Sequence, residues 1–215
     1  VETEKLSRVD LYGIGTNLTC FSFIQADEEK MERLAEMRKK VENAAGHTLE
    51  IVSGGNSAAL DLMMRGGICE GVDNFRLGES LLFGKERSRY TFLPGTRNDG
   101  FILECEVVEA KVKPSLPWGT AGVDSYGRKP VFTDRGEKRK KVICAIGRQD
   151  FDAETATPVD EGILILGASS DHLMLDVTDS VKEYKVGDIV ELRLGYFSVL
   201  RAFTSPYVEK IFLKK

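Results

Sequence analysis

One short stretch of the chain combines residue types that suit anion binding. The sequence VSGGNSAALDLMM (residues 52–64) runs from an apolar strand pattern through two glycines and an Asn-Ser pair into a helix pattern. The first N–H groups of a helix have no partner within it, and the Ser57 hydroxyl lies beside them in the sequence. Together with the positive end of the helix dipole, these donors predict a phosphate site. The alternative is a tight turn in which Ser57 only caps its own helix.

An arginine near the end of the next predicted strand indicates a second part of this site. The sequence FRLGES places Arg76 in a parallel strand that we expect to be buried, where an unpaired guanidinium would be unstable. Gly78 follows two residues later and leaves the backbone free to approach a ligand. Phosphate donors on one strand end and an arginine on the next favour a ligand with a phosphate at one end and a ring acceptor at the other.

The elements that position these residues alternate between strand and helix. Strands are expected at residues 9–17, 48–53 and 74–78, a long helix from the cap Asp27 to Ala45, and a short helix at 57–65. Such alternation predicts βα units and a parallel sheet. Three units leave a parallel sheet uncovered, so residues 1–84 are predicted to be the last part of a (β/α)8 barrel. A small three-stranded layer resting on the second half of the chain is the alternative.

The pattern changes after residue 84. A loop rich in glycine, proline and charge (residues 85–100) precedes a long β-type run at 101–112. Five more strand patterns follow, separated by Gly, Asp and Pro turns: KKVICAIG, GILILGA, HLMLDVTD, DIVELRLGYF and YVEKIFLKK. Short strands at this spacing predict an antiparallel sheet or barrel, so residues 85–215 are predicted to form a β domain.

Composition excludes several classes of function. With 30 Lys and Arg against 34 Asp and Glu, the net charge of -4 gives no reason to expect a nucleic-acid partner. The basic run at 135–141 is interpreted as the tip of a β-hairpin. No apolar run of roughly 18 residues predicts a transmembrane helix. Four scattered cysteines without metal-ligand spacing predict reduced core thiols, no metal site and a cytoplasmic location, and they are Cys20, Cys69, Cys105 and Cys144.

Six ordered blocks of sequence resemble the alanine/ornithine racemase family of pyridoxal-phosphate enzymes, nearest to its ornithine racemase branch. The blocks are GIGTNLTC, VSGGNSAAL, NFRLGESLLFG, AIGRQD, GASSDHLMLDVTD and TSPYV, and the resemblance spans residues 9–212. It implies a (β/α)8 barrel followed by a β domain, with pyridoxal 5′-phosphate (PLP) as the cofactor. It also implies interconversion of L- and D-amino acids by proton exchange at Cα.

The resemblance implies a cofactor role for seven residues. Ser57 matches the serine that binds the cofactor phosphate, supported by Gly55 and Asn56. The N–H groups of Gly78 and Glu79 match the second half of the phosphate cup. 

Arg76 matches the arginine that faces the pyridine nitrogen, and its permanent charge keeps that nitrogen unprotonated. The cofactor is then a weaker electron sink, which favours reversible proton exchange. Asn17 stands where alanine racemases carry a histidine that orients this arginine, and its amide is expected to orient Arg76 by hydrogen bonding.

The acid/base groups depart from the family pattern. Racemisation needs one such group on each face of a planar centre, and the family uses a Schiff-base lysine and a tyrosine from the partner subunit. Arg148 occupies the tyrosine position and is expected to hold the substrate carboxylate instead. The candidates for the opposite face are then His172 and Asp171, with Tyr196 or Tyr207 behind them. A purely structural role is the alternative for His172.

The Schiff-base lysine itself has no counterpart here. Lys5 lies in a polar segment, and Lys30, Lys39 and Lys40 lie on a charged helix face. The chain is therefore expected to be the C-terminal portion of a racemase, inactive alone and completed by an upstream barrel half on the same or a separate polypeptide. Family members form head-to-tail dimers, so the β domain is expected to act on the partner's site. 

The substrate is expected to be an amino acid, and one of ornithine type would require an acidic residue such as Asp150 or Asp171.

Two other functions remain open. A D-amino-acid aldolase or dehydratase of the same fold would need a metal, for which Asp171, His172 and Asp176 are the available ligands. Against it, adjacent residues in a β run point to opposite faces of the sheet. The other alternative is a non-catalytic cofactor-binding module.

Overall fold

The chain consists of two compact units. The structure is a computed structural model that describes residues 2–123 and 127–214. The first, here called the α/β unit, ends at Gly100, and the second, here called the β unit, begins at Phe101. Each is described by itself below.

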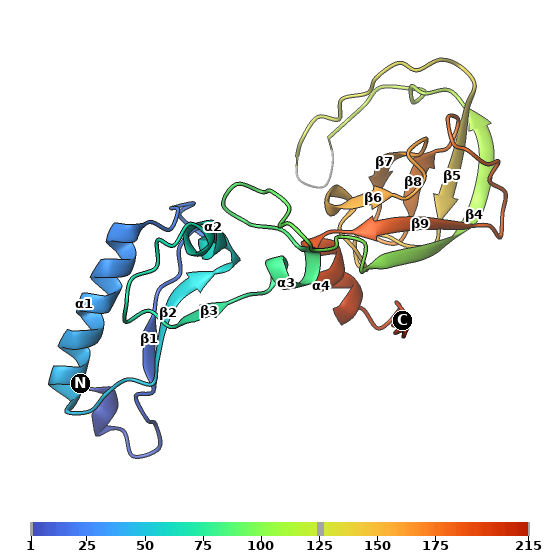
Figure 1. Cartoon of the computed structure of the whole chain (residues 1–215). Helices are drawn as coiled ribbons and strands as arrows, with labels where there is room; N and C mark the ends of the chain where they lie inside the picture. Colours follow the sequence, from blue (N-terminus) through green and yellow to red (C-terminus); the bar gives the residue numbers. More distant parts are fainter. Residues whose placement is uncertain (1, 124–126, 215) are drawn as a thin grey trace. The chain divides into compact units, whose positions relative to one another are not determined.

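The α/β unit contains a three-stranded parallel sheet in the order β1-β2-β3 (Figure 1). Its strands and helices are the 3-10 turn η1 (Thr3–Lys5), β1 (Gly13–Gly15), α1 (Glu28–Ala45), β2 (Ile51–Asn56), η2 (Ser57–Ala59), α2 (Leu60–Met64), β3 (Asn74–Arg76) and α3 (Glu79–Phe83). The predicted boundaries of α1 are confirmed. The Asp27 carboxylate accepts a hydrogen bond from the Lys30 N–H, and Gly46 ends the helix in the left-handed conformation at φ 81°.

The core of the α/β unit lies between α1, α2 and one face of the sheet. Met31, Val52, Leu62 and Val72 form a buried cluster, with partly buried apolar side chains packed against it. Gly54 belongs to this packing, because a Cβ there would lie 2.7 Å from Val72 Cγ1. The helices therefore pack directly on β2, which ends at the residues predicted to bind a phosphate.

The β unit contains a nearly closed antiparallel barrel with the strand order β6-β9-β4-β5-β8-β7. Its elements are β4 (Ile102–Lys113), β5 (Arg139–Cys144), the 3-10 turn η3 (Ala153–Thr155), β6 (Ala156–Pro158), β7 (Leu164–Ala168), β8 (Leu173–Asp176), β9 (Ile189–Leu194) and α4 (Tyr196–Thr204). Figure 1 shows β4 as a long, curved strand. On β9, Val190, Leu192 and Leu194 are buried and alternate with exposed residues, as expected when one face lines a core. The predicted fold class, part of a parallel α/β barrel followed by an antiparallel β structure, is confirmed.

Two strand predictions in the β unit are wrong. The strand expected to reach Phe197 ends at Leu194, and α4 begins at Tyr196. Val199 and Ala202 are buried three residues apart, which is helical spacing that the strand interpretation overlooked. The last predicted strand is also absent, because residues 206–214 pair with no strand. Although β6 and β7 are the edges of the sheet, the segment pairs with neither of them.

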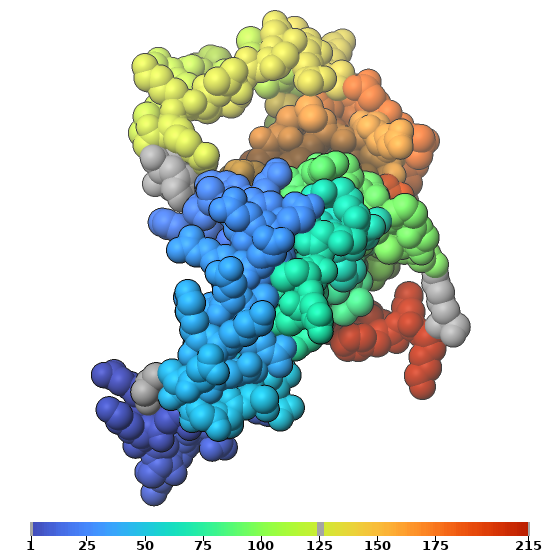
Figure 2. All heavy atoms as spheres, turned by 60° about the vertical axis from the view of Figure 1, so that its left-hand side comes forward, coloured from blue at the N-terminus to red at the C-terminus, as the bar shows by residue number. Residues whose placement is uncertain are grey.

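A long connection joins β4 to β5. The two strands pair antiparallel, from Lys113 opposite Arg139 to Val107 opposite Cys144. The basic run at 135–141 therefore contributes its last three residues to β5 rather than forming a tight hairpin tip. In Figure 2 the described parts of the connection, 114–123 and 127–138, arch away from the orange strands of the same unit.

The cysteines differ in burial. All four are free thiols, and Cys105 and Cys144 lie in the barrel core as predicted. Cys20 is exposed, so its assignment to a core was wrong; it follows β1 in a loop rather than lying on a strand. Among the helices of the described ranges, none has both the length and the apolar composition that crossing a membrane requires.

Candidate active site

Donor groups from the segment after β3 converge on the hydroxyl of Ser57. Its Oγ accepts hydrogen bonds from the Gly78 N–H at 3.3 Å, the Ser80 N–H at 3.2 Å and the Ser80 hydroxyl at 3.0 Å. Both serines are only 5% exposed. The Glu79 N–H, at the first residue of α3, donates to no residue that the structure describes. Three donors and one further N–H thus gather at the ends of β2 and β3.

Asn56, not Ser57, caps the helical turn that follows β2. Its side-chain oxygen accepts a hydrogen bond from the Ala58 N–H at 2.9 Å. The interpretation of Ser57 as a cap of its own helix is therefore wrong, and its hydroxyl is left for the donors of the next loop. Gly55, with φ 130°, adopts a backbone conformation that other residues rarely reach, which permits the turn between these strands.

Arg76 reaches across the ends of all three parallel strands. Its Nη1 donates to Ser53 Oγ on β2 at 2.5 Å, and its Nη2 donates to the Thr16 carbonyl after β1 at 2.9 Å. The expectation of a buried arginine is wrong, because β3 is an edge strand that ends at this residue. Within the described part of the chain its guanidinium forms no ion pair with a carboxylate. It is therefore held in place by two neutral acceptors.

Asn17 makes a different contact from the one expected. Its side-chain oxygen accepts a hydrogen bond from Asn56 Nδ2 at 3.1 Å, while the neighbouring Thr16 carbonyl orients Arg76. Asn17 thereby supports the capping residue next to Ser57. Its assignment as a cofactor-binding residue stays a prediction.

The sequence interpretation missed Ser53 and Ser80. Both are buried polar residues, 6% and 5% exposed. Each forms a hydrogen bond with one of the predicted site residues. Ser53 accepts from Arg76, and Ser80 donates to Ser57. Their positions in the sequence could have indicated this role. Ser53 is a polar residue in an apolar strand, and Ser80 lies in the first turn after Gly78.

In the β unit, Arg148 lies beside the turn between β7 and β8. Its N–H donates to the Ser169 carbonyl at 2.9 Å, and the Gln149 N–H donates to the Ser170 carbonyl at 3.0 Å. Gly147 permits this close approach, because a Cβ there would lie 2.3 Å from the Asp171 nitrogen. The structure therefore brings two separate sequence blocks, AIGRQD and GASSDHLMLDVTD, together on one surface.

Asp171 and His172 contact each other in this turn. Asp171 Oδ1 lies 3.1 Å from His172 Nδ1, and the two side chains are 57% and 50% exposed. The Ser170 hydroxyl, followed by His172, holds the pKa of the Asp171 carboxyl below its usual value. The expectation that the pair points to opposite faces of a strand is wrong, since both residues precede β8.

Several other candidates have structural partners. Asp150 is 4% exposed and accepts a hydrogen bond from the Ser205 hydroxyl at 2.6 Å, so it is not free for a substrate. Asp176 is 2% exposed and pairs with Arg139 Nε at 2.8 Å. Tyr196 packs against its neighbour Phe197 with ring centroids 5.6 Å apart. Tyr207 is 79% exposed.

The proposed metal ligands do not form a metal-binding group. Across residues 2–123 and 127–214, no three His, Cys, Asp or Glu side chains are placed to hold one ion. Asp171 and His172 lie before β8, whereas Asp176 ends that strand and is committed to Arg139. The metal-dependent alternative therefore loses the ligand set on which it depended.

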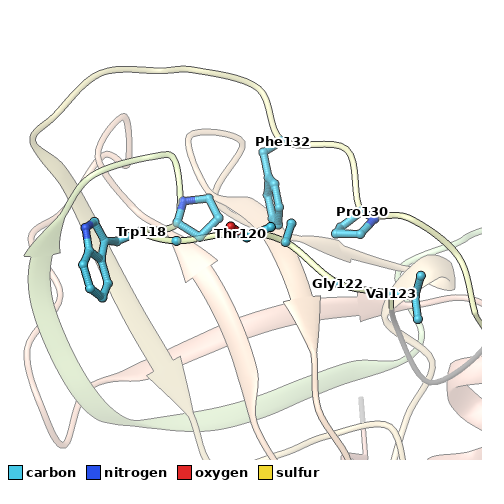
Figure 3. Close-up of a pocket in the computed structure, with 9 residues that line it drawn as sticks. Trp118, Thr120, Gly122, Val123, Pro130 and Phe132 are labelled. Atoms are coloured by element: carbon cyan, nitrogen blue, oxygen red, sulfur yellow. The ribbon is translucent and has the colours of Figure 1, made fainter.

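A hollow of about 250 Å³ lies in the connection between β4 and β5 (Figure 3). Its walls are mostly apolar or glycine residues: Pro117, Trp118, Gly119, Thr120, Ala121, Gly122, Val123, Pro130 and Phe132. None of these has a titratable side chain that could exchange a proton. The hollow therefore does not compete with the strand-end residues as a catalytic centre.

Comparison with known proteins finds similar amino-acid racemases. No family model matches the chain. It is 46% identical over 209 residues to the ornithine racemase of Acetoanaerobium sticklandii and 44% identical over 203 residues to the lysine racemase of Thermotoga maritima. The chain is therefore similar in sequence to amino-acid racemases over nearly its whole length. These alignments cover 97% and 94% of the chain but only 59% and 57% of the two racemases, so it spans little more than half their length.

Solved structures agree with this fold. Alanine racemase of Clostridium difficile 630, in complex with cycloserine, superposes with a TM-score of 0.52 at 21% identity, over 94% of this chain and 54% of that one. Alanine racemase of Bartonella henselae, with covalently bound pyridoxal phosphate, gives 0.51 at 21% identity, over 85% and 48%. D-threonine aldolase of Filomicrobium marinum gives 0.50 at 11% identity, over 88% and 47%. At these identities the likeness concerns the fold, which a racemase and an aldolase share.

Proposed function

We propose that the chain is the C-terminal portion of a PLP-dependent amino-acid racemase. Residues 1–84 would form the cofactor-binding end of the barrel, and residues 85–215 the β domain that meets the substrate. The observation that carries this proposal is the convergence of backbone and hydroxyl donors on Ser57 Oγ, beside an arginine with no carboxylate partner in the described ranges. The similarity to an ornithine racemase and a lysine racemase supports the same assignment.

The donors at Ser57 fit a phosphate. A phosphate group accepts several hydrogen bonds at once, and the N–H groups of Gly78 and Ser80 already point at one oxygen. The Glu79 N–H and the two serine hydroxyls add to this set. Asn56 holds the turn through its cap on Ala58, and Gly55 supplies the required backbone conformation.

Arg76 fits the other end of the cofactor. Its cationic guanidinium is held by Ser53 and Thr16. A cation at this position would donate a hydrogen bond to a ring nitrogen and disfavour its protonation. When bound, PLP supplies an electron-withdrawing system that acidifies the Cα–H of an amino acid, more weakly if its nitrogen stays neutral.

The β unit would supply the groups that handle the substrate. Arg148 would bind the α-carboxylate, since its terminal guanidinium nitrogens have no partner among residues 2–123 and 127–214. Asp171 would orient the His172 ring through Nδ1, which leaves Nε2 to accept or return a proton at Cα. We propose that these groups act on the cofactor site of a second subunit in a head-to-tail dimer. An upstream barrel half, on the same or another polypeptide, would complete each site.

A cofactor titration tests the proposal. We expect the 215-residue chain to bind PLP, seen as a change in its absorbance and in its ³¹P resonance. Ser57→Ala removes the acceptor and donor at the centre of the cup and should weaken binding by about tenfold or more. Ser22→Ala changes an exposed serine of the same unit and should bind PLP like the wild type. Equal affinity in Ser57→Ala and wild type would overturn the proposal.

A further inference from the structure

A second hollow, of about 440 Å³, opens on the surface of the β unit. It lies along β6 and β7, the two edge strands of the barrel sheet, and the η3 turn closes one end. Residues of different chemistry line it, among them Arg148, Glu154, Thr157, Leu164 and Leu166. It therefore adjoins the arginine proposed to hold the substrate carboxylate.

The hollow presents two opposite charges that are not used elsewhere. Arg148 donates through Nε to the Ala168 carbonyl at 2.8 Å, and its two terminal nitrogens contact no acceptor in the described ranges. Glu154 is exposed and forms neither a hydrogen bond nor an ion pair with any residue described by the structure. The two side chains also do not pair with each other. One cation and one anion thus stand apart on the wall of a single hollow.

The surface along β7 is apolar. Leu164 is 37% exposed and Leu166 is 45% exposed, although both lie on a strand of the barrel. Two exposed leucines on an edge strand suit contact with a hydrocarbon chain. The hollow therefore combines a carboxylate-binding group, an apolar wall and an ammonium-binding group.

We infer that this hollow binds an amino acid whose side chain ends in an ammonium group. Arg148 takes the α-carboxylate, the methylene groups lie against Leu164 and Leu166, and Glu154 pairs with the terminal ammonium. Glu154 is thereby the residue that selects the substrate class. The assignment rests on the proposed function, because it gives Arg148 the same carboxylate.

The other acidic candidates fit this role less well. Asp150 is buried under the Ser205 hydroxyl. Asp171 Oδ1 already accepts from Ser169, Ser170 and His172. The curated relatives are named for ornithine and lysine, two amino acids that end in an ammonium group. A side-chain site for that group is therefore needed, and Glu154 is the free carboxylate in the hollow.

A binding experiment with 5-aminovalerate tests this assignment without the cofactor. This compound carries a carboxylate and a terminal ammonium at the spacing found in ornithine, and pentanoate is its partner without the ammonium. Two-dimensional NMR of the 215-residue chain should show shifts confined to Arg148 and to residues 153–158 and 163–168. Glu154→Gln should weaken binding of 5-aminovalerate by about fivefold or more, since one charge-assisted contact is lost. Pentanoate should bind both proteins equally weakly.

Two further variants make the result specific. Glu161→Gln removes an exposed carboxylate that does not line the hollow and should bind 5-aminovalerate like the wild type. Glu154→Lys reverses the charge and should prefer glutarate, a dicarboxylate, over 5-aminovalerate. Shifts outside the hollow, or equal affinity of Glu154→Gln and wild type, would overturn the assignment. Loss of PLP binding in the titration above would instead overturn the proposed function, because that test depends on Ser57 in the other unit.

Discussion

The α/β unit and the β unit hold their candidate site residues in different ways. In the α/β unit, Ser57 and Arg76 lie at strand ends and are fixed by hydrogen bonds from the neighbouring strands and loops. In the β unit, Asp171 and His172 lie in a turn outside the barrel, and Arg148 is placed beside them by backbone hydrogen bonds. The residues of the first site lie at the ends of sheet strands, whereas those of the second lie in a turn outside the barrel.

The hydrophobic cores of the two units differ in size. The barrel buries many large side chains completely, including Phe151, Leu173 and Leu192. The α/β unit has a smaller core around Met31 and Val52, with exposed aromatic residues in the loop after β1. A change in the barrel core should therefore alter stability and leave the candidate cofactor site unchanged. A change at the strand ends of the α/β unit should alter both stability and that site.

The largest effect is expected from the barrel core. Leu192→Ala removes a completely buried side chain and should lower the free energy of unfolding of the β unit by about 2–5 kcal/mol. Urea denaturation, followed by NMR signals of each unit, measures this change. Leu200→Ala truncates a half-exposed leucine of α4 and should cost far less. Equal loss in both variants would contradict the contrast between core and surface.

A buried ion pair should make the β unit sensitive to acid. Burial favours the neutral form of Asp176, but hydrogen bonds from Arg139 and Thr178 outweigh it and lower the pKa of the carboxyl in the folded protein. The stabilisation is therefore complete above the ordinary aspartate pKa of about 3.9 and is lost as the pH falls below it.

Asp176→Asn tests this pair. It should destabilise the β unit by about 1.5–3 kcal/mol at pH 7, and by less at about pH 3. Urea titrations at the two pH values measure the difference. Asp179→Asn removes the exposed partner of the same arginine and should have a small effect. A loss for Asp176→Asn that does not shrink in acid would argue against the lowered pKa.

The close approach at Gly147 should be the next most sensitive feature. In Gly147→Ala the new Cβ would meet the Ser170 and Asp171 backbone at 2.3–2.4 Å, so the turn has to move, at a cost of about 1–3 kcal/mol. NMR shifts at Asp171 and His172 should change together with the stability. Gly122→Ala places a Cβ in open space and should leave that turn unchanged.

The smallest effect is expected at the cap in the α/β unit. Asn56→Ala removes the bond to Ala58 and the contact with Asn17, which should cost about 0.5–2 kcal/mol. Because this cap is next to Ser57, the variant should also weaken PLP binding, unlike the barrel variants. Asn98→Ala, at an exposed position, is the matched control. A loss of stability with unchanged PLP affinity would show that the Asn56 cap does not contribute to PLP binding.

Much of the α/β unit was predictable because its signals are local. Asp27 and Gly46 mark the ends of α1 by capping chemistry that neighbouring residues complete. The glycines and the Asn-Ser pair after β2 predict exposed donors for the same reason. The helix α4 was missed because an apolar segment after a strand pattern was interpreted as more strand, although its buried residues follow helical spacing.

The sequence by itself determined the parallel and antiparallel halves and the residues at the strand ends, because these follow from short-range periodicity and turn chemistry. Only the tertiary structure decided which groups meet. The contacts of Ser80 with Ser57, of Arg76 with Thr16 and of Arg148 with Ser169 join residues 21 to 60 positions apart, and they depend on strand order and register. The burial of Asp150 and the unpaired charge of Glu154 arise in the same way, since a side chain's partners depend on what packs beside it.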